Sequence, residues 1–313
     1  MNINNRLIAV AFTVIMGTTM CMAQRIAVVS ENGGTSVFET LQEAINAADN
    51  GSIIYLPGGG FPLSDDVVIT KKLCIIGLGY SVKSENVDGS TVISGNLWFN
   101  ENSSGSSVMG CYITGNVNIG NDGASVNDVV VKYCNLNSIQ VKNNNSLGTM
   151  VNQNYLRNGS NLARGTAFTN NVTPGISSEN GTILNNLFVN SSNFTTCYVA
   201  HNIFVNGQGI GNNNTFYANM AKSDVGDYPV NVSEIEWTDL FVNYNNAAIA
   251  PASDFHFTED YKLKYGSCGI YAGTGFNDSG QPPMPYISAK SIPGQTDASG
   301  ILNVRLRVNT GEK

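Results

Sequence analysis

Two short phrases with the same order of apolar and polar residues stand 16 residues apart in the middle of the chain. Residues 183–190 read ILNNLFVN, and residues 199–206 read VAHNIFVN. In both phrases an asparagine precedes an apolar pair. Equivalent positions recur along the chain at steps of 23, 20, 17, 15, 16 and 17 residues, at Cys111, Cys134, Asn154, Asn171, Asn186, Asn202 and Asn219.

A repeat of this length predicts an all-β solenoid. It is too short for a pair of helices and too long for a hairpin, but it fits one turn of two or three short strands. Stacked turns place equivalent residues about 4.8 Å apart. An inward asparagine can then donate its side-chain amide to the carbonyl of the asparagine below it. We therefore expect the seven recurring residues to form a single buried ladder.

The region before the repeats predicts a cap for the first turn. Residues 36–39 (SVFE) match a capping box, and Phe38, Leu41, Ala44, Ile45 and Ala48 then recur at helical spacing. Asn50 and Gly51 end this short helix. The stretches SIIYLPGGGF and DVVITKKLCIIGLGY predict the next strands.

The chain ends predict two further segments. Arg6 and the apolar stretch LIAVAFTVIMG, followed by small residues, indicate a signal peptide over residues 1–23, with cleavage after Ala23. A lipid anchor on Cys21 is the weaker alternative, because Met20 precedes it. The solenoid is expected over 24–280. Residues 281–313 are expected to form a proline-rich crossing and a tail strand on the outside of the solenoid, since apolar residues alternate from Leu302 to Val308.

Composition and charge restrict the partners. Only 12% of the residues are charged, the net charge is −7, and no Lys/Arg cluster occurs, which disfavours nucleic acid. Between Asn96 and Asn219, 29 of 124 residues are asparagine, as tight corners and ladders require. No later run approaches about 20 apolar residues, so no transmembrane segment is expected. The predicted location is outside the cytoplasm: secreted, periplasmic or on the outer surface.

Cysteine and histidine usage narrows the chemistry further. The five cysteines that remain after cleavage are odd in number and irregularly spaced, which argues against a disulfide framework. Cys111 and Cys134 occupy equivalent positions on consecutive turns, and either stacked thiols or a disulfide fits there, with thiols favoured. The chain has only two histidines, which argues against a histidine-based metal site.

The two ends of the repeat region resemble a known group of proteins. The first coil of right-handed parallel β-helix proteins of the pectate-lyase-like superfamily resembles the segments FETLQEAINAADNGSIIYLPGG and VVITKKLCIIGLG of this chain. The last coil of those proteins resembles the segments DLFVNYNN and DFHFTEDYKLKYGSCGIYAGTG. The resemblance covers about residues 25–275. It implies the right-handed β-helix fold but no particular reaction, because the superfamily includes lyases, hydrolases, esterases, phage-tail spikes and adhesins.

Few residues could carry catalysis on such a fold. A glycosidase needs paired carboxylates, and a calcium-dependent lyase needs acidic ligands and a basic Arg or Lys. Asp128, Lys132 and Arg157 are the best catalytic candidates, and Asp122 with Asp128 the best metal ligands. Solvated turn residues explain all four equally well. No cofactor is expected, with Ca²⁺ implied only for a lyase.

Carbohydrate is the expected partner. Asp224 and Asp227 begin an acidic region that could bind a cation or a sugar, or could simply solubilise terminal loops. Trp98 and Trp237 could stack on sugar rings. The sequence thus favours an exported β-helix that binds polysaccharide or a cell-surface glycan without catalysis. A polysaccharide lyase or glycoside hydrolase is the alternative, and a phage-like tail spike is less favoured, because no heptads occur.

Overall fold

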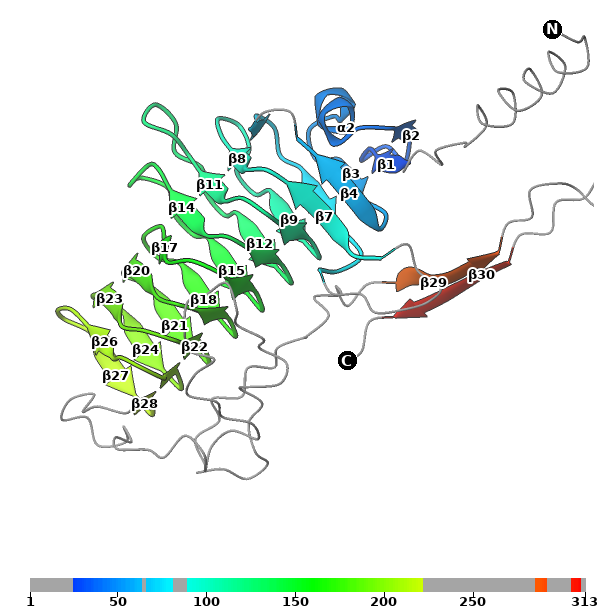
Figure 1. The fold of residues 1–313 in the computed structure, drawn as a ribbon. Helices are drawn as coiled ribbons and strands as arrows, with labels where there is room; N and C mark the ends of the chain where they lie inside the picture. The colour runs from blue at the N-terminus through cyan, green and yellow to red at the C-terminus, as the bar shows by residue number, and fades with distance from the viewer. Residues whose placement is uncertain (1–24, 64–65, 81–88, 222–284, 292–304, 311–313) are drawn as a thin grey trace, which may run out of the picture.

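The structure, a computed structural model, describes residues 25–63, 66–80, 89–221, 285–291 and 305–310. From residue 53 to residue 221 the chain winds into a parallel β-solenoid of about eight turns (Figure 1). Each turn contributes one short strand to each of three sheets, which we name A, B and C in the order in which the chain visits them. The predicted all-β solenoid is confirmed.

Sheet A has 11 strands. From β3 onward its neighbouring strands run parallel, and two antiparallel strands, β1 and β2, extend it at the N-terminal end. In spatial order the strands are β2 (Thr35–Phe38), β1 (Ile26–Val29), β3 (Ile53–Tyr55), β6 (Cys74–Ile76), β9 (Ser107–Met109), β12 (Val130–Lys132), β15 (Met150–Asn152), β18 (Ala167–Thr169), β21 (Thr182–Leu184), β24 (Tyr198–Ala200) and β27 (Thr215–Tyr217).

Sheets B and C are parallel throughout. Sheet B contains β4 (Gly59–Pro62), β7 (Thr91–Ser94), β10 (Tyr112–Ile113), β13 (Asn135–Leu136), β16 (Tyr155–Leu156), β19 (Val172–Thr173), β22 (Leu187–Phe188), β25 (Ile203–Phe204) and β28 (Met220–Ala221). Sheet C contains β5 (Val67–Ile69), β8 (Leu97–Phe99), β11 (Val117–Ile119), β14 (Ile139–Val141), β17 (Ser160–Asn161), β20 (Ile176–Glu179), β23 (Ser192–Thr195) and β26 (Gly209–Ile210).

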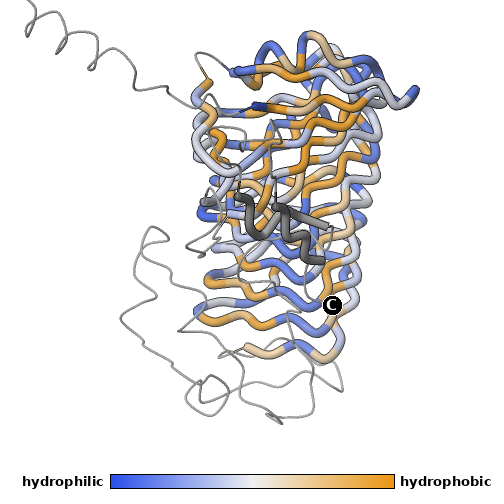
Figure 2. Tube along the Cα trace, turned by 90° about the vertical axis from the view of Figure 1, so that its right-hand side faces the viewer, coloured by the Kyte–Doolittle hydropathy of each residue, from blue (hydrophilic) through white to orange (hydrophobic). Residues whose placement is uncertain are grey.

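The interior of the solenoid is apolar because alternate residues of each strand point inward. In β8, for example, Leu97 and Phe99 are fully buried, whereas Trp98 points outward and is partly exposed. Figure 2 shows hydrophobic and hydrophilic positions alternating along the turns. Toward the C-terminal turns the core becomes aromatic, with the rings of Phe188 and Phe204 stacked at 4.9 Å between centroids.

The predicted asparagine ladder lies at the corner between sheets A and B and is confirmed. Each side-chain Nδ2 donates to the Oδ1 of the next asparagine. The Nδ2–Oδ1 distances are 3.1 Å from Asn154 to Asn171, 3.2 Å from Asn171 to Asn186, 2.9 Å from Asn186 to Asn202 and 3.0 Å from Asn202 to Asn219. The five side chains are buried, so the ladder satisfies groups that would be costly to bury alone.

The two cysteines continue the same column as free, buried thiols. The main-chain N–H of Cys134 donates to Oδ1 of Asn154 at 2.9 Å, so this turn joins the ladder through its backbone. The thiol of Cys134 lies 3.1 Å from the main-chain oxygen of Lys132. Of the two arrangements that the spacing allowed, stacked thiols are the one observed.

These thiols predict a decline in stability at high pH. Burial raises the pKa of Cys134 to about 12. The pKa of Cys111 is raised well above its usual value, mainly by burial and secondly by the neighbouring Cys134. Between about pH 9 and pH 12 the unfolded chain therefore loses protons that the folded chain keeps, so the free energy of unfolding should fall as the pH rises through this range.

Labelling with a thiol reagent at pH 8 tests whether the two thiols are buried. Cys111 and Cys134 should react only after denaturant is added, whereas the half-buried Cys74 should react in the folded protein. Fast modification of a variant that retains only Cys111 and Cys134, before unfolding, would contradict the burial of both thiols.

The corner itself depends on a left-handed residue just before each ladder position. Backbone φ angles there are 70° at Gly110 and between 51° and 57° at Tyr133, Gln153, Asn170, Asn185, His201 and Ala218. A second left-handed column marks the corner between sheets C and A, and Asp128 belongs to it, with φ of 58°. Asparagine, aspartate and glycine adopt this conformation most readily, and Asn102, Asn170, Asn180, Asn185 and Asn213 do so here, which explains a small part of the asparagine content.

A short helix caps the first turn, as predicted, but the predicted capping box is wrong. Residues 35–38 form strand β2, and helix α2 spans Leu41–Ala47. Its N-cap is Thr40, whose Oγ1 accepts from the main-chain N–H of Glu43 at 3.2 Å, while the Glu43 carboxylate accepts from the Thr40 N–H. Ser36 lies in the exposed outer strand instead, since β2 pairs with β1 along its whole length.

Replacing Thr40 with alanine should lower the free energy of unfolding by about 1 kcal/mol, because the main-chain N–H of Glu43 loses the hydroxyl oxygen that caps it. The matched control is Ser36→Ala, which removes the hydroxyl of the capping box that the sequence pattern suggested and should change little. Urea unfolding of the two variants separates these positions. A larger loss for Ser36→Ala would contradict the observed cap.

The C-terminal region contains a strand pair. Strand β29 (Pro285–Ser291) pairs antiparallel with β30 (Arg305–Thr310), with an irregularity between Ile287 and Ala289. The tail strand is thus confirmed from residue 305, but part of the expected proline-rich crossing is itself a strand. Docking of this tail on the solenoid stays a prediction. The signal peptide, Cys21 and the expected closing coil lie outside the described residues.

Candidate functional site

The turns between sheets C and A shorten abruptly halfway along the solenoid. They comprise residues 70–73, 100–106, 120–129 and 142–149 in the earlier coils, then 162–166, then only 180–181 and 196–197, and 211–214 in the last coil. The long turns project beyond the stack (Figure 1). Because equivalent strands remain in register, the difference in turn length leaves a step on the surface where the short turns begin.

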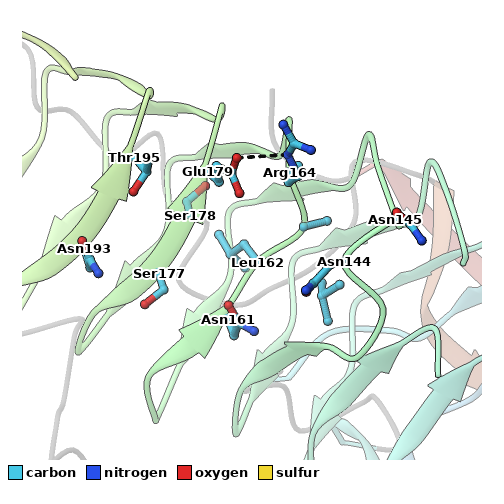
Figure 3. Close-up of a pocket in the computed structure, with 12 residues that line it drawn as sticks. Asn144, Asn145, Asn161, Leu162, Arg164, Ser177, Ser178, Glu179, Asn193 and Thr195 are labelled. Atoms are coloured by element: carbon cyan, nitrogen blue, oxygen red, sulfur yellow. Dashed lines mark ion pairs between the residues drawn. The ribbon is translucent and has the colours of Figure 1, made fainter. Parts of the chain in front are cut away.

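A groove of about 440 Å³ lies at this step. The turn that follows β14 supplies one wall, and outward side chains of β17, β20 and β23 supply the base (Figure 3). Asn161, Ser177 and Asn193 of the base are in direct register on consecutive strands. The lining consists mainly of amides and hydroxyls: Val141, Asn144, Asn145, Asn161, Leu162, Ala163, Arg164, Ser177, Ser178, Glu179, Asn193 and Thr195.

The two charged residues of the lining neutralise each other. Arg164 Nε lies 3.2 Å from Glu179 Oε1, and their side chains are 52% and 48% exposed. Figure 3 shows the pair at the edge of the groove, on neighbouring coils. At this exposure the ion pair contributes little to stability, typically less than about 1 kcal/mol. Its main effect is to leave the groove without net charge.

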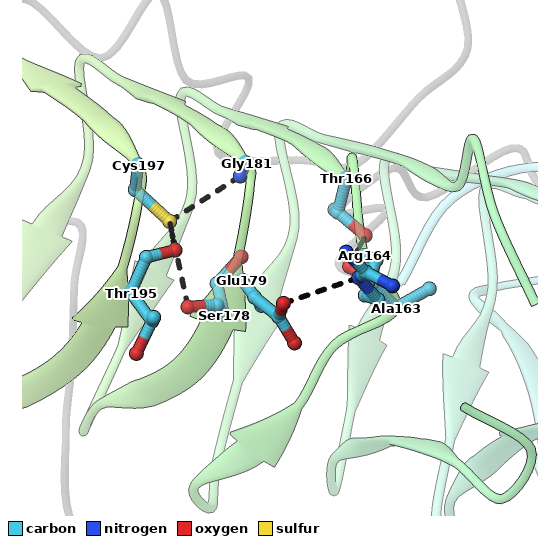
Figure 4. A network of polar contacts seen from close by, with 8 residues as sticks. All are labelled: Ala163, Arg164, Thr166, Ser178, Glu179, Gly181, Thr195 and Cys197. Carbon is cyan, nitrogen blue, oxygen red and sulfur yellow. Dashed lines mark hydrogen bonds and ion pairs between the residues drawn. The ribbon is translucent and has the colours of Figure 1, made fainter. Parts of the chain in front are cut away.

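The groove rests on a buried polar network (Figure 4). The main-chain N–H of Gly181 donates to the sulfur of Cys197 at 3.3 Å, and the same sulfur lies 3.4 Å from the main-chain oxygens of Ser178 and Thr195. These contacts tie the coils beneath the groove together. The Ser178 Oγ is buried and has no hydrogen-bond partner among the described residues.

This lining suits a ligand rich in hydroxyl groups. Amide side chains both donate and accept hydrogen bonds, and so do hydroxyls, so together they can match the alternating donors and acceptors of a sugar. Nothing in the groove resembles a nucleophile with its base, since its only ionisable side chains are the paired Arg164 and Glu179.

The three predicted catalytic residues stand on different parts of the coil. Asp128 occupies the corner between sheets C and A, Lys132 projects from the outer face of sheet A, and Arg157 follows β16 of sheet B. The one ion pair among the described residues joins Arg164 to Glu179, so it includes none of these three. No ion pair therefore joins any two of the three, and their catalytic role stays a prediction.

Arg157 is engaged in structural contacts. Its guanidinium donates to Oδ1 of Asn135 at 2.6 Å and to the main-chain oxygens of Ile113 and Thr114, and it lies over the ring of Tyr112 at 4.8 Å. Burial lowers its pKa. These contacts join three successive coils on the outside of sheet B. They give Arg157 a structural role that requires no substrate.

The remaining candidates are placed as follows. Asp122 and Asp128 are exposed turn residues, and within the described ranges no three His, Cys, Asp or Glu side chains gather into a metal site. The Trp98 indole Nε1 donates to the Asp66 carboxylate at 2.9 Å on the outer face of sheet C. Asp224, Asp227 and Trp237 lie outside the described residues.

The groove residues were not among the predicted site residues, although the sequence contains a signal for them. The repeat step shrinks from 20 to 17 to 15 residues between Cys134 and Asn186. A solenoid whose turns shorten while its strands stay in register must carry a step where the turns retract. The shrinking period therefore marks the coils that form the groove.

Comparisons with known proteins give no family. No protein-family model matches the chain, and neither a curated protein nor a solved structure matches it. Within the described residues, no helix is long and apolar enough to cross a membrane.

Proposed function

We propose that this protein is an exported, non-catalytic carbohydrate-binding protein whose groove beside β17, β20 and β23 holds part of a polysaccharide or a cell-surface glycan. The observation that carries the proposal is the lining of the groove. It consists mainly of amides and hydroxyls from successive coils, and its only two charged residues form an ion pair. Polar groups held in fixed positions in a cleft orient the small molecule that binds there.

Rigidity favours binding of this kind. The base residues stand on short strands whose neighbours are fixed in register, and the ladder and the Cys197 network fix the coils behind them. Side chains held in this way lose little freedom when a ligand binds. The resemblance to right-handed parallel β-helix proteins of the pectate-lyase-like superfamily agrees with a carbohydrate ligand, and membership of that superfamily is part of the proposal.

Export is also part of the proposal. A signal peptide over residues 1–23 would place the groove outside the cytoplasm, where polysaccharides and surface glycans occur. Mass spectrometry of protein recovered from an expressing bacterium should find a mature N-terminus at Gln24. A mature chain that begins at Cys21 with an added lipid would support the lipid-anchored alternative instead.

Shortening two amides at the base of the groove should weaken glycan binding. The double substitution Asn161→Ala with Asn193→Ala removes side chains that line the groove and make no structural hydrogen bond to a described residue. We expect a loss of affinity of roughly 5- to 150-fold, since each of the two lost hydrogen bonds to the ligand contributes about 0.5–1.5 kcal/mol. Isothermal titration against a panel of polysaccharides measures the change.

Asn206→Ala is the matched control, because Asn206 is an exposed asparagine outside the groove. It should bind as the unchanged protein does. Equal binding by the double variant would show that the groove is not the site. Appearance of new reducing ends or of unsaturated products during the titration would favour the enzymatic alternative.

A further inference from the structure

We infer that the binding site continues from the groove along the outer face of sheet C to Trp98, and that this face takes an extended, uncharged glycan lying parallel to the solenoid axis. The inference rests on the proposed function and adds to it the direction, the length and the charge of the ligand.

One outward column of sheet C connects the groove to Trp98. Strand pairing places its residues in direct register from coil to coil, in the order Val68, Trp98, Asn118, Gln140, Asn161, Ser177 and Asn193. The middle of this column is polar, with amides on three consecutive coils. The last three residues are the base of the groove. A ligand that leaves the groove in this direction therefore meets further amides.

The far end of the column is apolar and held in place. The Trp98 indole donates to Oδ2 of Asp66 at 2.9 Å, and Oδ1 of the same carboxylate accepts from the Asn96 amide at 2.8 Å. The polar edge of the ring is thus already bonded. Beside it, Val68 is exposed. A fixed, partly exposed indole next to an aliphatic side chain is a suitable stacking surface for a sugar ring.

Asn118, between Trp98 and Gln140, has an unusual environment for an outward side chain. It is only 3% exposed, and its amide makes no hydrogen bond to any described residue. The amide atoms are not among the buried polar atoms that lack a partner, so they keep some access to solvent, and a hydroxyl of a bound sugar could hydrogen-bond to them there.

The length of the column sets the length of the ligand. Trp98 and Asn193 are separated by five strand spacings, or roughly 24 Å at about 4.8 Å each. A pyranose ring with its linking oxygen is about as long as one spacing. A chain that contacts both ends therefore needs about five or more sugars, and a disaccharide can contact only one end.

The charges along this face indicate an uncharged ligand. Arg164 is paired with Glu179, and the Asp66 carboxylate accepts two hydrogen bonds from protein donors. An acidic glycan would find no unpaired cation in the lining of the groove. It would also approach a protein of net charge −7, which repels polyanions at a distance.

Titration calorimetry with hexasaccharides and disaccharides tests all three features. The neutral probes derive from β-glucan, mannan and xylan, and the acidic probes from polygalacturonate and alginate. We expect a neutral hexasaccharide to bind and Trp98→Ala to weaken it roughly tenfold, the contribution of one stacking contact. Trp98→Phe, which keeps an aromatic face, should retain most of the affinity. Circular dichroism confirms that each variant is folded.

Each of the following outcomes would contradict one part of the inference. If Asn161→Ala with Asn193→Ala abolishes hexasaccharide binding but Trp98→Ala and Trp98→Phe do not change it, the groove binds and the track to Trp98 is wrong. A hexasaccharide that binds no tighter than the disaccharide contradicts the extended ligand. Binding of the acidic probes alone contradicts the uncharged class. If no probe binds, the proposed function itself fails.

Discussion

Replacing Asn186 with leucine is expected to destabilise the solenoid by about 3 kcal/mol or more, because it leaves buried polar groups unsatisfied. Oδ1 of Asn186 accepts from the main-chain N–H of Asn171 at 2.8 Å and from its Nδ2 at 3.2 Å. Nδ2 of Asn186 donates to Oδ1 of Asn202 and to the main-chain oxygen of Phe168, both at 2.9 Å. Leucine is similar in size but can replace none of these hydrogen bonds.

The position of Asn186 in the middle of the ladder enlarges the effect. A turn of a solenoid is stabilised mainly by its contacts with the turns on either side, so weakening one central interface separates the stack into two shorter pieces. Chemical denaturation should show a lower midpoint, and hydrogen exchange should be fastest in the turns next to residue 186.

The control for this substitution is Asn190→Leu, in the same turn. Asn190 is exposed and its side chain makes no hydrogen bond to a described residue, so leucine there should change the free energy of unfolding by less than about 0.5 kcal/mol. Similar losses for the two variants would show that the ladder contributes no more than an ordinary surface asparagine.

The fold could be predicted from the sequence because its strongest constraint repeats. Each ladder asparagine must stand at one corner, so its spacing reports the length of every coil, and the observed pairs join the residues that follow these positions. The free thiols of Cys111 and Cys134 agree with the same register. Features that repeat with the coil are therefore visible in the sequence.

Features that occur once were harder to predict. Ser36 and Thr40 both precede a Glu at the spacing of a capping box. Thr40 is the N-cap because residues 35–38 form strand β2, which pairs with β1. The hairpin partner of β30 was missed because Pro285 and its neighbours fit a crossing as well as an edge strand.

The candidate site was predicted least well because it depends on differences between coils. The search for catalysis favoured charged residues, and Arg157 was selected for its charge although its contacts hold coils together. The groove instead uses asparagine and serine, residue types that also build the corners of the fold. The shrinking repeat step marks the coils of the groove, but the step between long and short turns in the structure shows which of their asparagines line it.

Replacing Phe188 with alanine is expected to cost about 3–5 kcal/mol, the usual range for removing a buried aromatic ring. The Phe188 ring is fully buried between neighbouring coils. Its centroid lies 4.9 Å from that of Phe204, 6.0 Å from that of Phe194 and 6.2 Å from that of Phe168. Alanine would leave a cavity that the neighbouring rings cannot fill, because their own coils fix them in register.

Double-mutant cycles distinguish a stack of rings from independent burial. If Phe188 and Phe204 stabilise each other, the loss for the double alanine variant should be smaller than the sum of the single losses by about 0.5–1.5 kcal/mol. Tyr198→Ala is the control: this aromatic side chain lies on the outer face of sheet A and is 44% exposed, so its loss should stay near 0.5 kcal/mol. Additive losses for the two phenylalanines, measured by urea unfolding, would mean that the rings are only buried side by side. The aromatic column would then contribute to stability through its buried area alone, without coupling one coil to the next.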